Sequence, residues 1–317
     1  MRILLALDGS PASEVACRLV AGNRWPAGSV IDVVGVVEPL VDVFGVGIVQ
    51  EEEPPDGSLT DPELEAAIDR SVEALRGADL IMRRAMLVGR PASAIVSEAA
   101  EFRAELIVLG NRGRGRIERM LVGSVSAEVV DHARCSVLVA RRPEIRRVLL
   151  AVDGSDTSRR AVEFVEANPV LKERRIEVLT VVPSRTPPAA VMLGGVYGAS
   201  IEAYEDSVDA ARTQGEGLAS GAAAELRAAG YDVTWSISAG DAAHEIIASA
   251  ARSDIDLVIM GSHGRTGVSR LLLGSVARNV LLHSGSSVLI VREPVRARDE
   301  ESITVTATAL AAIGHPA

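Results

Sequence analysis

Two segments of the chain carry glycine and serine at a spacing that suits an anion-binding site. The pattern G-x2-G-x9-G-S occurs twice, 151 residues apart, at Gly110, Gly113, Gly123 and Ser124 and again at Gly261, Gly264, Gly274 and Ser275. The first glycine follows an apolar strand, where the lack of a Cβ lets the backbone approach a ligand. The Gly-Ser pair opens a helix, whose unpaired amides and dipole attract phosphate. The alternative is a set of turn glycines with a serine cap, which two identically spaced copies make less favoured.

An aspartate ends the first apolar strand of each segment. Asp8 and Asp153 are both followed by Gly-Ser. A carboxylate at this position can accept hydrogen bonds from ribose hydroxyls or hold a metal ion that bridges phosphates. The alternative is an aspartate that caps the following helix, and the two roles are compatible.

Basic side chains surround the two glycine segments. Arginine neutralises phosphate well, although a solvated loop is an equal alternative for any single arginine. His263 stands between two motif glycines where the first copy has Arg112; it could touch phosphate, but a lone loop histidine is more often exposed. The arginines of these loops are Arg112, Arg114, Arg116, Arg119, Arg265 and Arg270.

Several classes of protein are disfavoured by what the sequence lacks. There is no G-x4-G-K-[ST] loop, no G-x-G-x-x-G after the first strand and no G-x-S-x-G elbow. The net charge of −10 and the 3% aromatic content argue against a nucleic-acid binder. No apolar run approaches the roughly 20 residues that span a bilayer. Cys17 and Cys135 offer neither a disulfide framework nor a zinc site, and we expect both to be buried.

The chain is a tandem duplication. Residues 2–10 read RILLALDGS and residues 147–155 read RVLLAVDGS, and the glycine segments align in the same order. The offset grows from 145 to 151 residues, so the second copy has a small insertion between its first and third strands. Within each copy, apolar strand-like runs alternate with helical patterns, such as a helix that opens at Pro11 with Ser10 as its N-cap.

This alternation predicts an α/β fold. Continuous apolar strands that alternate with helices indicate parallel sheets covered by helices on both faces, and right-handed crossovers make them doubly wound. Such sheets bind ligands at the carboxyl ends of their strands, where both the aspartates and the glycine segments fall. We therefore expect two tandem doubly wound domains, each with its own ligand site.

The sequence resembles the universal stress protein family in its tandem form. The DGS after the first strand, the G-x2-G-x9-G-S signature and the final strands VLVAR and VLIVR carry the resemblance. It covers residues 1–143 and 144–294 as two domains and leaves 295–317 as a tail outside both. The signature is specific to the nucleotide-binding branch of the family.

The resemblance implies a Rossmann-like five-stranded parallel sheet in each domain, with ATP or another adenine nucleotide at the strand ends, with or without Mg²⁺. Asp8 and Asp153 would lie beside the adenosine, Val37 and Val182 would offer backbone groups to adenine, and Ala6 and Ala151 would admit the base. The phosphates would be held by Gly110, Gly113, Gly123, Ser124 and Val125, and in the second copy by Gly261, Gly264, Gly274, Ser275 and Val276.

The resemblance also implies partners and a location. The last strands of the two domains would pair, which makes the chain an internal pseudo-dimer, and a further homodimer is an open alternative. A cytoplasmic protein is expected, with no nucleic-acid partner and no membrane partner.

Three functions compete. The first is a non-enzymatic regulator of the stress response, in which nucleotide orders the glycine loops and residues 187–198. The second is a slow Mg²⁺-dependent ATPase or nucleotide-transferring enzyme, which the missing Walker lysine and missing base disfavour. The third is an interaction scaffold that ignores nucleotide.

Overall fold

The structure is a computed structural model that describes residues 1–39, 61–113, 122–184, 201–264 and 273–292. The tail 295–317 and the stretch 187–198 lie outside the described residues. The same is true of five of the six loop arginines, namely Arg114, Arg116, Arg119, Arg265 and Arg270.

Strands and helices alternate in both repeats, as the sequence predicts. The first repeat contains β1 (Arg2–Leu7), α1 (Pro11–Ala21), β2 (Val30–Val37), α2 (Pro62–Leu75), β3 (Ile81–Val88), α3 (Pro91–Glu101), β4 (Leu106–Gly110), α4 (Ser124–His132) and β5 (Ser136–Ala140). The second contains β6 (Arg147–Ala151), α5 (Asp156–Ala167), the 3-10 turn η1 (Pro169–Leu171), β7 (Arg175–Val182), α7 (Ile201–Ala228), β8 (Asp232–Ala239), α8 (Ala242–Arg252), β9 (Leu257–Gly261), α9 (Ser275–His283) and β10 (Ser287–Val291).

Side-chain caps fix where the helices after the first strands begin. The Ser10 hydroxyl accepts a hydrogen bond from the Ser13 amide at 3.2 Å, with Pro11 at the first helical position, as predicted. The Ser155 hydroxyl caps Ser158 in the same way at 3.2 Å. A serine cap satisfies one of the amides that a helix N-terminus leaves unpaired. These two helices therefore begin at the same place relative to the strands that precede them.

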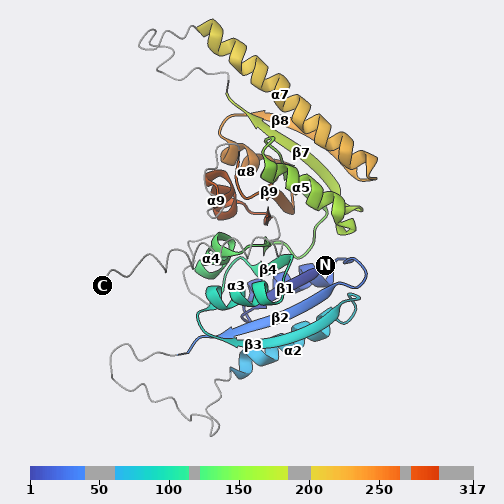
Figure 1. The fold of residues 1–317 in the computed structure, drawn as a ribbon, viewed down its shortest axis with the longest axis vertical. Coiled ribbons are helices and arrows are strands. Elements are labelled where there is room, and N and C mark those ends of the chain that lie inside the picture. The colour runs from blue at the N-terminus through green and yellow to red at the C-terminus, as the bar shows by residue number, and fades with distance from the viewer. Residues whose placement is uncertain (40–60, 114–121, 185–200, 265–272, 293–317) are drawn as a thin grey trace, which may run out of the picture.

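The ten strands of the described residues form one sheet, in the order β3-β2-β1-β4-β5-β10-β9-β6-β7-β8. Each repeat contributes five parallel strands, which confirms the expected fold. Figure 1 shows the first repeat below and the second above, with β3 and β8 at the two ends of the sheet. Strand twist accumulates across so many strands. This rotation turns the strands of one half of the sheet relative to those of the other. As a result, the arrowheads of β2 and β3 in the first repeat and of β7 in the second point to the same side of the molecule (Figure 1).

The two halves of the sheet join through their last strands. β5 and β10 are antiparallel, and Val139, Leu138 and Val137 pair with Val288, Leu289 and Ile290 in turn. This confirms the expected pairing of the two repeats. An apolar strand left at the edge of a sheet invites pairing with another chain, and here the covalent tandem satisfies both edges internally.

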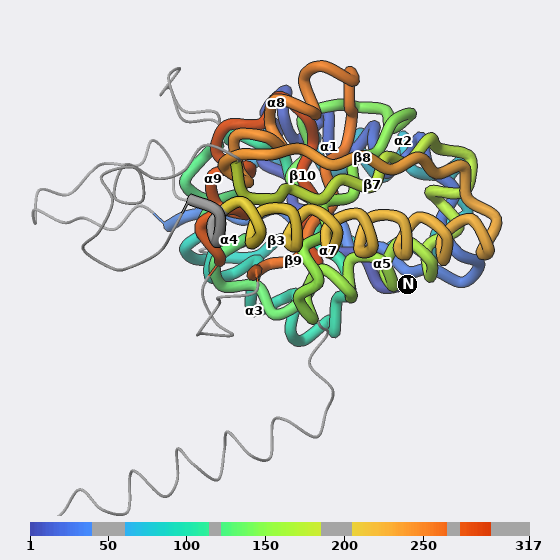
Figure 2. Tube along the Cα trace, turned by 90° about the horizontal axis from the view of Figure 1, so that it is seen from above, coloured from blue at the N-terminus to red at the C-terminus, as the bar shows by residue number. Residues whose placement is uncertain are grey.

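The hydrophobic core is organised by face of the sheet rather than by repeat. On one face, buried side chains of α1 and α2 form a single cluster with those of α5 and α7. On the other face, α3 and α4 share a cluster with α8 and α9. Figure 2, along the long axis of the molecule, shows α7 lying across β7 and β8. The two repeats thus share both layers of their core.

Arginines that follow the joined strands cap helices of the opposite repeat. Arg141, after β5, donates hydrogen bonds to the carbonyl of Leu281 in the last turn of α9 and to that of Ser286, just before β10. Arg292, after β10, donates to the carbonyls of Val130 and Ala133 at the end of α4. Burial lowers the pKa of Arg141 to about 10. Each guanidinium supplies donors and positive charge where a helix C-terminus lacks both.

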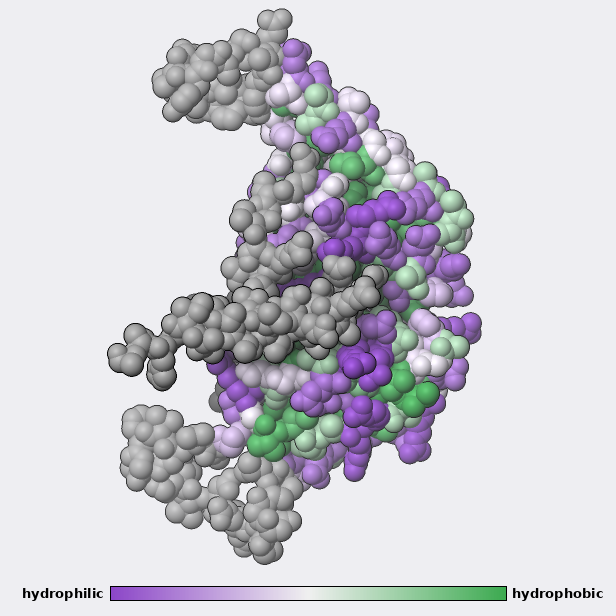
Figure 3. All heavy atoms as spheres, viewed as in Figure 1, coloured by the Kyte–Doolittle hydropathy of each residue, from purple (hydrophilic) through white to green (hydrophobic). Residues whose placement is uncertain are grey.

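The described surface is mostly polar, and the few large apolar side chains on it have a common location. Figure 3 shows small hydrophobic patches among hydrophilic atoms. Ile81, Val88 and Trp235, the exposed large hydrophobics of the described chain, lie on the outermost strands β3 and β8. No described helix has both the length and the apolar composition required to cross a membrane.

The two cysteines are buried, as expected. Burial raises the pKa of the Cys135 thiol to about 12 and also raises the pKa of Cys17. Both thiols therefore stay protonated and unreactive at neutral pH.

A carboxylate is buried inside the first repeat. Asp32, in the middle of β2, has no exposed surface, and its nearest basic nitrogen is on Arg83, 3.7 Å away. Glu98 of α3 lies beside it. Burial, followed by the Asp32 carboxylate and the charge of Glu101, raises the pKa of Glu98 against the opposing effect of Arg83.

We predict that the two repeats unfold in one transition, because they share both cores. The chain has two tryptophans, Trp25 in the first repeat and Trp235 in the second. In the single-tryptophan variants Trp25→Phe and Trp235→Phe, urea unfolding followed by fluorescence should give coincident curves. Leu138→Ala, a core truncation at the β5–β10 ladder, should lower the free energy of unfolding by about 2–5 kcal/mol for both probes. Separate midpoints for the two probes would contradict the shared core.

We predict that Glu98→Gln stabilises the protein at pH 8 and not at pH 4. A raised pKa means that the folded protein holds this proton more tightly than the unfolded chain does. The free energy of unfolding therefore falls as pH rises from the ordinary glutamate pKa to the raised value. Urea unfolding of wild type and variant at both pH values measures the difference. The exposed Glu173 offers a matched control, since Glu173→Gln removes the same charge and should lack this pH-dependent gain.

Candidate functional site

The aspartate at the end of the first strand lies in a tight turn in both repeats. Gly9 and Gly154 follow it with φ of 76° and 79°, a conformation that glycine adopts without strain. One carboxylate oxygen of Asp8 accepts a hydrogen bond from the Ser10 amide at 3.0 Å. The helix N-caps are Ser10 and Ser155, so the alternative in which the aspartates cap these helices is wrong.

The second carboxylate oxygen faces the glycine loop after the fourth strand. A Cβ placed on Gly113 would lie 2.7 Å from Oδ2 of Asp8. On Gly264 it would lie 2.9 Å from Oδ2 of Asp153. The motif thus needs glycine here because the carboxylate approaches the loop backbone closely. The predicted Asp and Gly positions lie together in both repeats.

The first motif glycine has a packing reason that sequence analysis did not anticipate. A Cβ on Gly110 would lie 2.6 Å from the backbone of Ala12, and one on Gly261 would lie 2.6 Å from the backbone of Thr157. These glycines let the N-terminus of α1 or α5 approach the end of β4 or β9. These positions need glycine because of packing within the protein, whether or not a ligand is near.

The Gly-Ser pair opens a helix whose first amides have no side-chain cap. Gly123 and Gly274 are the N-cap residues of α4 and α9, and neither helix has a side-chain hydrogen bond at its cap. The glycine amides donate back to the strand-end loop, from Gly123 to Asn111 at 2.6 Å and from Gly274 to Ser262 at 2.8 Å. The amides that follow, with the helix dipole behind them, suit an anion.

In the second repeat, these elements enclose one cavity of about 310 Å³. Its lining includes seven of the eight residues predicted for this repeat, namely Ala151, Asp153, Gly261, Gly264, Gly274, Ser275 and Val276. Their counterparts Ala6, Asp8, Gly110, Gly113, Gly123, Ser124 and Val125 occupy the same positions on β1, β4 and α4 of the first repeat.

The valine predicted at the end of the second strand is displaced by one residue. Val181 lines the cavity, whereas Val182 does not. The Val182 carbonyl accepts a hydrogen bond from Gly240 at 3.0 Å, and the Val37 carbonyl accepts one from Gly89 at 3.0 Å. By the repeat offset, Val36 is the counterpart of Val181 in the first repeat.

An apolar wall of the cavity was missed by sequence analysis. Leu179, Ile246 and Met260 line the cavity together with Val181. The signal lay in the apolar positions of the second strand and the third helix, which look like ordinary core residues in a sequence. The cavity therefore has an apolar end and an amide-rich end, as binding sites for organic phosphates require.

His263 lines the same cavity, so the alternative of an exposed loop histidine is wrong. Its Nδ1 lies 3.1 Å from the Ser262 hydroxyl, and its Nε2 is buried with no partner among the described residues. Burial, followed by the charge of Arg292, lowers the pKa of His263. His132 and His283, by contrast, end α4 and α9 and contact backbone carbonyls one turn earlier, which is a structural role.

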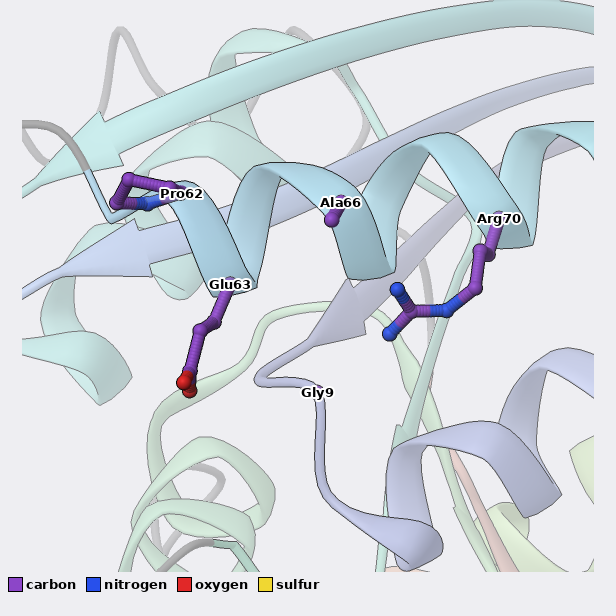
Figure 4. Close-up of a pocket in the computed structure, with 5 residues that line it drawn as sticks. All are labelled: Gly9, Pro62, Glu63, Ala66 and Arg70. Carbon is purple, nitrogen blue, oxygen red and sulfur yellow. The ribbon is translucent and has the colours of Figure 1, made fainter.

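A second cleft, of about 420 Å³, borders the first repeat's aspartate turn on the side of α2. Figure 4 shows Glu63 and Arg70 reaching from α2 toward the loop at Gly9, with Ala66 between them. In the second repeat, Leu218 of α7 fills the corresponding position, 3.0 Å from where a Cβ of Gly154 would lie. The first repeat has Ala67 at the equivalent helix position.

The described chain contains no group of three His, Cys, Asp or Glu side chains able to hold a metal ion by itself. A divalent cation at the strand ends would therefore rely on the single aspartate and on phosphate oxygens of a ligand. Mg²⁺ is commonly bound in this way, through one or two carboxylates and phosphates.

Comparison with known proteins decides the family. The model of the Universal stress protein family matches residues 1–141 and again residues 144–292. The chain belongs to the universal stress protein family. A universal stress protein of Mycobacterium tuberculosis is 31% identical over 238 residues, which cover 72% of this chain and 75% of that protein. One of Methanocaldococcus jannaschii is 31% identical over 157 residues, covering 46% of this chain and 94% of that protein.

Solved structures share the fold over nearly the whole chain. A universal stress protein from Archaeoglobus fulgidus covers 92% of this chain, with 96% of its own length, at 19% identity and a TM-score of 0.57. A putative universal stress protein from Pseudomonas aeruginosa covers 92% of both chains at 16% identity and a TM-score of 0.58. At such low identity, these likenesses establish the architecture of this universal stress protein and not its ligand.

We predict that alanine at the two kinds of motif glycine has different effects. Gly261→Ala forces a Cβ into the backbone of Thr157, so it should lower the free energy of unfolding by about 1–3 kcal/mol or more. Gly274→Ala meets only a 3.1 Å contact with the Ser262 carbonyl, at a φ of −62° that any residue adopts. It should change stability less and should weaken anion binding more. Urea unfolding and calorimetric titration of the two variants measure both effects, and equal losses of stability would contradict the assignment.

Proposed function

We propose that this universal stress protein binds an adenine nucleotide, ATP foremost, in each of its two repeats and regulates the stress response through nucleotide-dependent conformation. The observation that carries the proposal is a cavity of the second repeat that gathers the strand-end aspartate, the motif glycines and the uncapped N-terminus of α9.

The two ends of this cavity suit the two ends of a nucleotide. Leu179, Val181, Ile246 and Met260 offer an apolar slot of the kind that accepts a planar base. Asp153 lies between this slot and the glycine loop, where a carboxylate can accept hydrogen bonds from ribose hydroxyls. The amides after Gly274 would then receive the phosphates. The first repeat carries the same motif residues, so we propose a second site there.

Regulation fits this arrangement better than rapid catalysis. Phosphoryl transfer requires positive charge on the transferring and leaving groups and a positioned nucleophile. The motif supplies main-chain amides, and the sequence has no Walker lysine. A ligand that binds one conformation of the glycine loops more tightly than another shifts the population toward it, and partners can read that change. A slow Mg²⁺-dependent enzyme and a nucleotide-independent scaffold remain the alternatives that the following experiment separates.

We predict that the purified protein carries nucleotide and that the variant Gly123→Val with Gly274→Val does not. Valine adds bulk where each Cβ would already lie about 3.1–3.3 Å from the glycine-loop backbone, so phosphate loses its place. Mass spectrometry of the denatured protein identifies the released ligand. Intact ATP supports the regulator, whereas ADP or AMP favours slow turnover.

A matched control uses glycines with open space around them. A Cβ on Gly77 or Gly285 would meet no atom within 4 Å. The variant Gly77→Val with Gly285→Val makes the same chemical change in each repeat and should retain the nucleotide. Wild-type protein that neither carries nor binds adenine nucleotides would leave the scaffold as the function, and retention of affinity in the motif variant would place the site elsewhere.

A further inference from the structure

The two proposed sites differ in charge at equivalent positions of the glycine loop. Arg112 and His263 both stand directly before the second motif glycine, 151 residues apart. In each of them a side-chain nitrogen, Nε of Arg112 and Nε2 of His263, is buried without a hydrogen-bond partner among the described residues. A buried polar nitrogen without a partner is costly, and a ligand group that reached it would satisfy it.

Each of these side chains lies beside the arginine that follows the last strand of its own repeat. The positive charge of Arg112 contributes to the lowered pKa of Arg141, and the positive charge of Arg292 contributes to the lowered pKa of His263. The glycine strand and the last strand are adjacent, with Gly110 paired to Ala140 and Gly261 paired to Val291. Next to the glycine-loop end of each proposed site there are therefore two basic side chains. One is on the loop, and the other is at the joint between the repeats.

An ion pair between the repeats lies next to the joint arginine of the second repeat. The negative charge of Asp131 on α4 raises the pKa of Arg292 against the larger, opposite effect of burial. The Asp131 carboxylate also accepts a hydrogen bond from Arg278 at 2.7 Å. By the offset of 151 residues, the counterpart of Asp131 is Leu282 of α9, which has no charge. Burial, which lowers the pKa of His263, favours the neutral form of its ring. Among the described residues, the loop and the joint of the first repeat therefore carry two guanidinium groups, Arg112 and Arg141, whereas those of the second carry the guanidinium of Arg292 and the imidazole of His263.

We infer that the two sites select different phosphate chains: the first repeat favours the more highly charged nucleoside triphosphate, and the second repeat discriminates less between triphosphate and monophosphate. Arg112 and His263 are the specificity-determining residues. The inference rests on the proposed function, since it names what each proposed site prefers. Its physical basis is that every added phosphate charge gains more from a guanidinium at the loop position than from an imidazole there.

The experiment isolates one site at a time in the full chain. Gly274→Val leaves the first site open, and Gly123→Val leaves the second. Calorimetric titration with ATP, ADP and AMP gives the ratio of the AMP to the ATP dissociation constant for each open site. We expect this ratio to be roughly tenfold larger, or more, in the first site, since about 1.4 kcal/mol corresponds to a factor of ten. Equal ratios in the two sites would overturn the inference.

Exchange of the two residues supplies the control. Arg112→His in the first open site should lower the ratio, and His263→Arg in the second should raise it. Arg112→Gln and His263→Gln form a second pair for use if either exchange variant fails to fold, as judged by circular dichroism; the first should lower the ratio and the second should leave it unchanged. Ratios that do not respond to Arg112 would overturn its role. Absence of binding of all three nucleotides to wild type would instead refute the proposed function, so the two failures are distinguishable.

Discussion

The antiparallel pairing of β5 with β10 is the interaction on which the rest of the molecule depends. Without it, each repeat would end in a short apolar strand with unpaired backbone groups along one side. With it, ten strands form one sheet, and both layers of helices pack over a continuous apolar surface. Hydrophobic burial at the joint is reinforced by the two arginines, whose hydrogen bonds satisfy carbonyls in the last turns of α4 and α9.

This joint is also next to the proposed ligand sites. The strand that ends in the first motif glycine pairs directly with the strand that makes the joint. A charge that enters the glycine loop therefore acts on an arginine whose other nitrogens hold a helix of the opposite repeat. The duplicated architecture places ligand recognition and inter-repeat contact on the same few residues, which separate, linker-joined domains would not do.

The sequence predicts the features that depend on local pattern. The duplication, the strand ends, the Ser10 cap and the Gly-Ser helix starts follow from periodicity and from residue types whose conformational preferences are strong. Features that depend on distances between remote segments were not predicted. The packing role of Gly110, the lining by Val181 in place of Val182 and the burial of His263 each require knowledge of which backbone lies opposite. The reciprocal capping by Arg141 and Arg292 belongs to the same class, because nothing in either arginine's own segment indicates helix carbonyls of the other repeat.

The divergence of the two copies follows different rules in the core and at the sites. In the first repeat, Gly35 of β2 faces Leu64 of α2, and a Cβ on Gly35 would lie 3.0 Å from its Cγ. In the second, the equivalent strand residue is Thr180 and the equivalent helix residue is Gly215, with the bulk exchanged between the two elements. Close packing demands this compensation, since interior volume must be filled without overlap.

The charge differences show no such compensation. Where the first repeat has Arg112, the second has His263, and the acid beside Arg292 is paired with Arg278, so that pair does not restore the missing charge. A core that conserves volume across two copies keeps the backbone of both sites alike. Against that common frame, a change of one or two charges near a phosphate end alters what the sites prefer without altering how they fold. The duplicated chain can therefore present two sites of the same shape and different charge to the same pool of nucleotides.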